Sequence, residues 1–229
     1  ATATAAAATA TATAAVSAAP VQPANVSAQA GSTNITADAA ITLAGDAINV
    51  DGDGVTVDGS TATITAAGSY SISGTLDDGQ IVVDAGDNDD VTLILNGVDI
   101  SNSSSAAINA VNAEDVILEL AAGSTNVVSD GQTYVYPDDT IDEPNAAVFS
   151  DVDLVITGEG ALSVTGNYND GIATKDELLI ESGTLIVNAA DDGIRGKDSI
   201  VVQSGAITIN AGGDGLKSDD DEDAAKGFI

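Results

Sequence analysis

The sequence predicts an all-β chain wound as a right-handed single-stranded parallel β-helix, a β-solenoid, with coils of about 22 residues. Three observations carry this prediction. Short runs of Val, Ile and Leu are bounded by Gly, Asp or Asn, as in residues 91–95 and 116–120. No stretch keeps the apolar spacing of an α-helix for several turns. Finally, one unit of sequence repeats at a fixed interval.

The repeat is clearest in an Asp-Gly motif followed by an apolar residue. Residues 170–172 return as residues 192–194 and again as residues 214–216, at intervals of 22 residues. Equivalent residues in successive coils of a β-solenoid stack about 4.8 Å apart. The sequence therefore predicts inward ladders of apolar side chains, and an amide ladder of Asn188 over Asn210 at a bend.

Two segments depart from the coil pattern. Residues 1–30 form a leader rich in Ala and Thr, with Pro20 and Pro23 near its end. We interpret it as a linker or, because Ala and Thr alternate in places, as a strand that pairs with another subunit. Residues 31–229 are predicted to form the β-helix domain. Within it, residues 129–145 are too long and too acidic for a corner, which predicts a projecting loop.

The chain resembles the bacterial carbohydrate-binding domain-containing proteins from about Ile41 to its end. The resemblance rests on the Asp-Gly coils and on four segments that follow one another in order: residues 68–76 (GSYSISGTL), 78–83 (DGQIVV), 95–100 (LNGVDI) and 142–150 (DEPNAAVFS). It implies a calcium-binding right-handed parallel β-helix with a pectate-lyase-like fold. It further implies an extracellular or cell-surface protein that binds plant-type or acidic polysaccharide with calcium and has no established catalysis.

Composition restricts the partners and cofactors. The 36 Asp and Glu against 5 Lys and Arg give a net charge of −31, which disfavours nucleic acid and anionic membranes. Because Cys and His are both absent, a thiolate or imidazole zinc site is excluded, whereas oxygen-seeking cations such as calcium remain possible. No apolar run is long enough for a transmembrane segment.

The basic residues are confined to the last third of the chain. The 22-residue register predicts that Lys175 stacks on Lys197 and that Arg195 stacks on Lys217. Such a patch could bind the carboxylates of a uronic acid polymer. Alternatively, these cations neutralise nearby acids such as Asp176 and Asp198. The candidate carbohydrate-binding cations are Lys175, Arg195, Lys197 and Lys217.

The same register stacks Asp170, Asp192 and Asp214, whose bare carboxylates would repel one another. A calcium ion would relieve this repulsion and could bridge to a uronate carboxylate of the glycan. Alternatively, these Asp residues face water and form Asx turns beside Gly. The candidate calcium ligands are Asp170, Asp191, Asp192, Asp214, Asp219, Asp221 and Asp223.

Neutral sugars stack on aromatic rings, but the chain contains no Trp. Tyr134, Tyr136 and Tyr168 lie near segments predicted to be loops. We take Tyr134 and Tyr136 as the first candidates for sugar contact, with packing at a strand edge as the alternative role.

Together these features predict an extracellular, calcium-stabilised surface protein that binds polysaccharide without catalysis. The alternative function is a structural subunit of an extracellular filament, associated head to tail through the leader and the open ends of the β-helix. A polysaccharide lyase with Lys175 or Lys197 as base is a weaker alternative, because it rests on analogy of fold alone.

Overall fold

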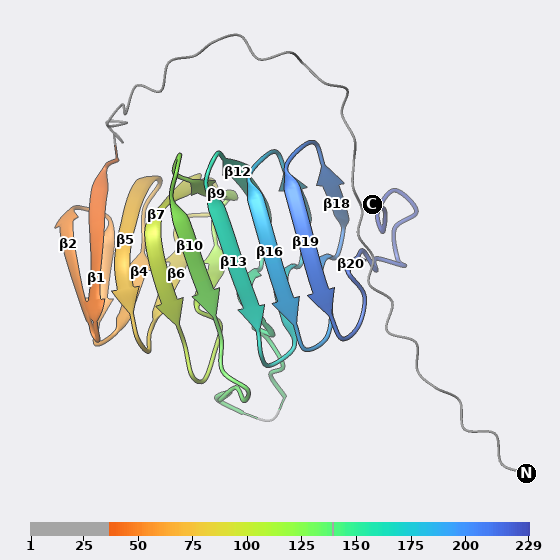
Figure 1. Cartoon of the computed structure of the whole chain (residues 1–229), viewed down its shortest axis with the longest axis horizontal. Coiled ribbons are helices and arrows are strands. Elements are labelled where there is room, and N and C mark those ends of the chain that lie inside the picture. The colour runs from red at the N-terminus through yellow and green to blue at the C-terminus, as the bar shows by residue number, and fades with distance from the viewer. Residues whose placement is uncertain (1–36, 139) are drawn as a thin grey trace, which may run out of the picture.

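The computed structural model describes residues 37–138 and 140–229, in which twenty β-strands and no helix are present (Figure 1). The strands form two sheets. The 12-stranded sheet contains β1 (Ala39–Gly45), β2 (Ala47–Gly52), β5 (Gly68–Leu76), β7 (Val91–Ser101), β9 (Asp115–Leu120), β10 (Thr125–Ser129), β12 (Asp153–Gly158), β13 (Ala161–Gly166), β15 (Glu177–Ile180), β16 (Thr184–Ala189), β18 (Ser199–Val202) and β19 (Ala206–Ala211). The 8-stranded sheet contains β3 (Val55–Asp58), β4 (Thr61–Ile64), β6 (Gln80–Asp84), β8 (Ile108–Asn112), β11 (Ala146–Ser150), β14 (Asp170–Thr174), β17 (Ile194–Gly196) and β20 (Leu216–Lys217).

Nearly all strand pairs are parallel and join one coil to the next. Each of the regular coils contributes one strand to the 8-stranded sheet and two to the 12-stranded sheet, as β14, β15 and β16 do. Ile172 pairs with Ile194, and Ile194 pairs with Leu216, so the predicted 22-residue register is confirmed. We call the direction in which the coils follow one another the stack axis; it runs horizontally in Figure 1.

The core fills the space enclosed by the coils. Alternate residues of each strand point inward, and the inward side chains of neighbouring coils are in register. Leu162 lies beside Leu185 and Val164 beside Val187, and all four are fully buried. Aliphatic ladders of this kind stabilise the fold by removing apolar surface from water.

In the first two of the three repeated Asp-Gly motifs, the glycine is required by the close packing of the coils. A Cβ atom on Gly171 would lie 2.4 Å from Val187 Cγ1, and one on Gly193 would lie 2.3 Å from Ile209 Cγ2. At Gly171 and Gly193 any larger residue would therefore collide with an inward side chain, whereas a Cβ atom on Gly215 would meet nothing within 4 Å.

The first coils differ from the prediction of parallel pairing throughout. β1 and β2 form an antiparallel hairpin, and so do β3 and β4. Within the described residues no coil precedes these strands, and a hairpin satisfies their backbone groups locally. The leader, residues 1–30, lies outside the described residues, so its proposed role in filament formation stays a prediction.

The loop of residues 130–145 joins β10 to β11 and extends past the ends of the strands (Figure 1). Part of it also lies against the segment between β7 and β8, where the Val135 N–H donates a hydrogen bond to the Ser104 carbonyl. Val148 points into the enclosed core, so its neighbour Phe149 points outward. Phe149 is nevertheless only 2% exposed, so the outer face of β11 is covered as well. Phe149 forms a second apolar cluster with Ala106, Ala146 and Ala173.

Candidate functional site

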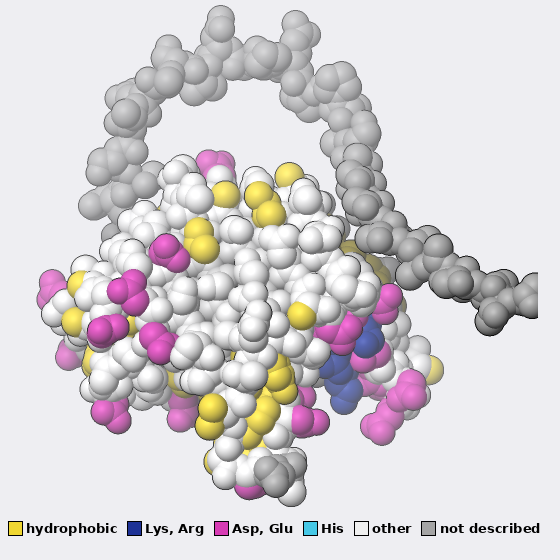
Figure 2. Space-filling view, turned by 60° about the horizontal axis from the view of Figure 1, so that its bottom comes forward, with side chains coloured by type: hydrophobic (Ala, Val, Ile, Leu, Met, Phe, Trp, Pro, Cys, Tyr) yellow, Lys and Arg dark blue, Asp and Glu magenta, His cyan; other side chains and the backbone are white. Residues whose placement is uncertain are grey.

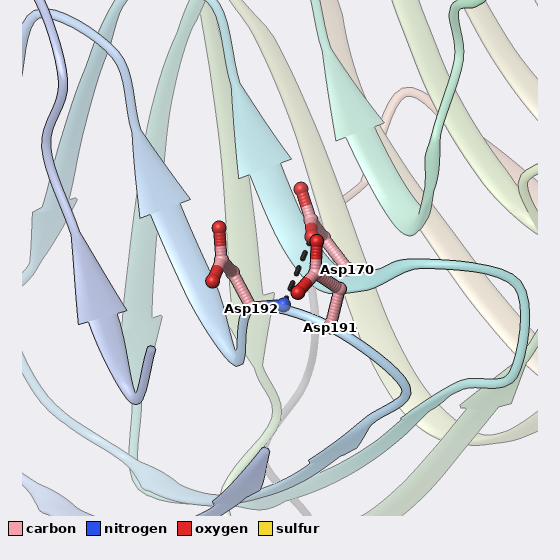
Figure 3. A group of neighbouring side chains, drawn as sticks. All are labelled: Asp170, Asp191 and Asp192. Carbon is pink, nitrogen blue, oxygen red and sulfur yellow. Dashed lines mark hydrogen bonds between the residues drawn. The ribbon is translucent and has the colours of Figure 1, made fainter. Parts of the chain in front are cut away.

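One corner of the stack brings three of the predicted calcium ligands together. Asp170 begins β14, and Asp191 and Asp192 lie in the turn between β16 and β17 of the next coil (Figure 3). Each offers a carboxylate oxygen, and these oxygens lie within 4.8 Å of one another. Asp170 and Asp192 are buried, whereas Asp191 is exposed.

Backbone hydrogen bonds allow the acidic side chains to stack. The Asp192 N–H donates to Asp170 Oδ1 at 3.1 Å, and the Asp214 N–H donates to Asp192 Oδ1 at 2.8 Å. Each carboxylate therefore accepts a bond from the next coil, and the predicted repulsion is partly offset without a metal ion. Asp214 contributes only its backbone N–H to this series of bonds, and Asp214 itself is exposed.

The electrostatics of the corner leave negative charge to be compensated. Burial raises the pKa of Asp170 to about 6, and the charges of Asp192 and Asp191 act in the same direction, against the N–H bond from Asp192 and the charge of Arg195. Calcium binds oxygen ligands at about 2.3–2.6 Å, so oxygens that lie less than 5 Å apart can share one ion. The residues present therefore fit calcium in donor type and spacing.

Cationic side chains lie next to this corner. Arg195 pairs with Lys217 in the β17–β20 register, as predicted. Lys217 Nζ lies 2.8 Å from Asp192 Oδ2, and this bond raises the pKa of the lysine. Arg195 Nε lies 3.2 Å from Asp219 Oδ2. Asp219 is therefore an ion-pair partner of the cations and is not part of the three-carboxylate group.

The other two predicted cations are placed differently. Lys175 Nζ lies 2.8 Å from Glu143 Oε2 and 3.0 Å from Asp151 Oδ1, so it ties the 130–145 loop to the coils. Lys197 is half-buried, and no ion pair joins it to another described residue. Asp198, expected to be offset by Lys175 or Lys197, is instead paired with Lys226.

The last predicted ligands, Asp221 and Asp223, lie in the exposed segment after β20. Asp223 Oδ1 accepts a hydrogen bond from the Ala225 N–H, which is the local turn bonding expected as the alternative for these acids. Within the described residues, neither joins the group around Asp170.

Three tyrosines form an aromatic cluster beside the corner. The rings of Tyr134 and Tyr168 are stacked, with centroids 4.3 Å apart and planes 16° apart. Tyr136 meets Tyr168 edge to face at 6.4 Å. Tyr168 was not among the residues predicted for the site, because only the fold brings it from the β13–β14 turn to the loop. It is 37% exposed, whereas the other two rings are half-buried.

A buried acid holds this cluster in place, and it too was not predicted. Asp130 is 5% exposed. Its Oδ2 accepts a hydrogen bond from the Tyr134 hydroxyl at 2.7 Å, and its Oδ1 accepts one from the Asn167 N–H. Burial raises the pKa of Asp130, and burial followed by the bond to Asp130 raises that of Tyr134. No pattern in the sequence distinguishes Asp130 from the other loop acids.

The surface view reflects this arrangement. Acidic side chains are scattered over the face shown in Figure 2, whereas Lys and Arg gather at one place, near a group of hydrophobic side chains. Among the described residues, no helix is long and apolar enough to span a membrane.

Known proteins resemble this chain in sequence and in fold. A solved structure titled a polysaccharide lyase-like protein from C. thermocellum, in a gadolinium derivative, is similar to this chain with a TM-score of 0.81 and 40% identity, covering 82% of this chain and 77% of that one. A carbohydrate-binding domain-containing protein of Acetivibrio thermocellus is 44% identical over 126 residues, or 55% of this chain. That match spans 44% of the relative's length. The family model for carbohydrate-binding domain-containing proteins matches residues 58–229, and the chain belongs to this family.

Proposed function

We propose that the protein is an extracellular, calcium-stabilised module that binds uronate-bearing polysaccharide without catalysing a reaction on it. Carbohydrate binding follows from the family. The observation that carries the finer proposal is the corner where three carboxylates lie within 4.8 Å of one another beside the cations Arg195 and Lys217. Such a site offers two ways to hold a carboxylate: directly on the guanidinium and ammonium groups, or through a bound calcium ion.

The architecture that presents this site is, in our proposal, a right-handed parallel β-helix with coils of about 22 residues. The parallel register between coils and the likeness to a polysaccharide lyase-like structure support it. Right-handed crossovers are also the strong preference of parallel strands in one sheet.

Calcium is supported by the chemistry of the ligands. Asp170, Asp191 and Asp192 supply only hard oxygen donors, which suit calcium rather than a soft metal. The structural relative was solved as a gadolinium derivative. Gadolinium is a hard cation that also prefers oxygen ligands. When bound, calcium would supply positive charge at the corner; the chain's own residues would orient it through the backbone bonds to Asp170 and Asp192.

The protonation of Lys175, one candidate base, supports the absence of catalysis. Elimination from a uronate needs a base that can be deprotonated near neutral pH. Lys175 is bonded to Glu143 and Asp151, and these bonds raise its pKa. A lysine held in its charged form is a poor base and a good structural tie.

The test is binding of the full chain to polygalacturonate and to an uncharged 1,4-linked glucan, each measured with calcium and with a chelator. We expect binding to polygalacturonate that weakens on chelation and at high salt. Arg195→Gln should weaken it further, whereas Lys226→Gln, which removes the same charge away from the corner, should not. Unsaturated products that absorb in the ultraviolet would overturn the non-catalytic proposal, and equal binding of both polymers would overturn the preference for uronate.

A further inference from the structure

A shallow hollow lies on the outer face of the 12-stranded sheet, where β13, β16 and β19 end. Its lining comes from the ends of these three strands and the turns that follow them: Thr165, Gly166, Asn167, Asn188, Ala189, Ala190 and Asn210. The preceding residues Val164, Val187 and Ile209 belong to or pack against the enclosed core. Thr165, Asn188 and Asn210 therefore point outward, into the hollow.

These three outward residues form a ladder along the stack axis. Thr165 pairs with Asn188, and Asn188 pairs with Asn210, in three consecutive coils. Parallel strands lie about 4.8 Å apart, which is close to the length of one pyranose unit in an extended 1,4-linked chain. The hollow thus repeats its polar groups with roughly the period of a glycan.

The side chains of the ladder have donors and acceptors available for a ligand. No hydrogen bond joins the side chain of Thr165, Asn188 or Asn210 to another described residue. Asn210 is exposed and Asn188 half-buried. A side-chain amide both donates and accepts, as a sugar hydroxyl does, so each rung can bind hydroxyls of one sugar unit.

The position of the hollow relates it to the proposed site. Asn167, at one side of the hollow, donates its Nδ2 to the Asp130 carbonyl and is followed in the chain by Tyr168 of the aromatic cluster. Ala190, from the middle coil of the hollow, is followed by Asp191 and Asp192. The turns that line the hollow therefore continue into the residues of the aromatic cluster and of the acidic corner.

We propose that a glycan chain lies in this hollow parallel to the stack axis, one sugar unit to a coil, with hydroxyls of three consecutive units bound by Thr165, Asn188 and Asn210. This inference rests on the proposed polysaccharide binding and adds the direction and length of the bound segment. A glycan lying across the coils would meet only one rung of the ladder.

The experiment is calorimetric titration of the full chain, in calcium, with oligogalacturonates of one to six units. Affinity should rise with each unit up to at least the trimer. Asn188→Ala should weaken dimers and longer oligomers about five-fold, as the loss of about one hydrogen bond predicts. Asn210→Ala should weaken trimers and longer oligomers but leave dimers nearly unchanged, because a dimer can bind the other two rungs.

Gln203→Ala is the matched control, since it removes an exposed amide from another turn of the same coil. A lengthwise glycan is overturned if the monomer binds as tightly as the trimer, or if both asparagine variants bind like the unchanged protein. If the unchanged protein binds no oligomer, and no polygalacturonate either, the proposed function itself fails. Polymer binding without length dependence would refute the inference alone.

Discussion

The backbone N–H of Asp192 donates a hydrogen bond to the carboxylate of Asp170, 3.1 Å away and one coil earlier in the stack. One interaction therefore belongs both to the fold and to the candidate metal site. It fixes the register between coils, and it aims the Asp170 carboxylate at the neighbouring acids. Changes at this corner should accordingly be visible in stability as well as in binding.

Calcium affinity should depend on Asp191, the exposed member of the group. Asp191→Asn removes one charge from the three-carboxylate group while leaving the backbone ladder intact, so calcium affinity should fall about ten-fold or more. Calorimetric titration with calcium alone measures it. Asp99→Asn, an exposed change on β7, is the control for net charge. Equal affinity in the two variants would place the calcium site elsewhere.

Stability without calcium should fall as pH rises through about 4 to 6. The pKa of Asp170 is about 6 in the folded chain, above its ordinary value of 3.8, so the folded state binds more protons than the unfolded state in this window. The folded form is therefore favoured at the lower pH, and this advantage is lost as the carboxyl ionises. Thermal melting in chelator across this range measures the effect.

Asp170→Asn should flatten this pH dependence, because the amide oxygen still accepts the Asp192 N–H but does not titrate. The general repulsion of a chain with a net charge of −31 acts in the same direction as Asp170. The difference between the variant and the unchanged protein is therefore the relevant quantity. If the melting temperatures of the two proteins change with pH in the same way, Asp170 does not titrate in this window.

The Tyr134 hydroxyl should stabilise the loop more than the Tyr136 hydroxyl does. It donates to Asp130 Oδ2 and lies 2.9 Å from the Ala146 carbonyl, and both acceptors belong to buried residues. Tyr134→Phe should lower the free energy of unfolding by about 1–3 kcal/mol, since a buried acceptor loses its partner. Tyr136→Phe is the control, because its hydroxyl bonds the Asp142 and Pro144 carbonyls in a more exposed setting. Urea denaturation compares them, and equal losses would count against the special role of Asp130.

Phe149 should behave as a core residue although it points away from the enclosed core. Phe149→Ala should cost about 3–5 kcal/mol, the usual range for a buried aromatic side chain. Ile186→Ala, on an outward position that is 46% exposed, should cost far less. Denaturant unfolding gives both values. A small loss at Phe149 would mean that this outward face of β11 is not covered in solution.

The sequence by itself determined the period of the fold. Residues 170–172, 192–194 and 214–216 reveal a 22-residue coil because three consecutive coils place an acid, a glycine and an inward aliphatic residue at the same point. From that register alone, the pairing of Arg195 with Lys217 and of Asn188 with Asn210 could be predicted, and both pairs are in register. No hydrogen bond joins the Asn188 and Asn210 side chains, so the predicted amide ladder is present only as a strand register. The closeness of Asp170 to Asp192 follows from the same repeat.

Only the tertiary structure decided the contacts of the loop with the coils and the ion pairs at the corner. Asp130, Tyr134 and Tyr168 meet because a loop without a repeat folds back on the stack, and a non-repeating segment carries no register from which its contacts could be read. The same limit explains Lys175, whose partner Glu143 comes from the loop, and Asp219, which is paired with Arg195 rather than placed in the carboxylate group. Contacts between equivalent residues of successive coils follow from sequence spacing, because strand pairing repeats them in each coil. The pairing of charged side chains at a corner depends instead on the length of the side chains and on competition among many acids for few cations.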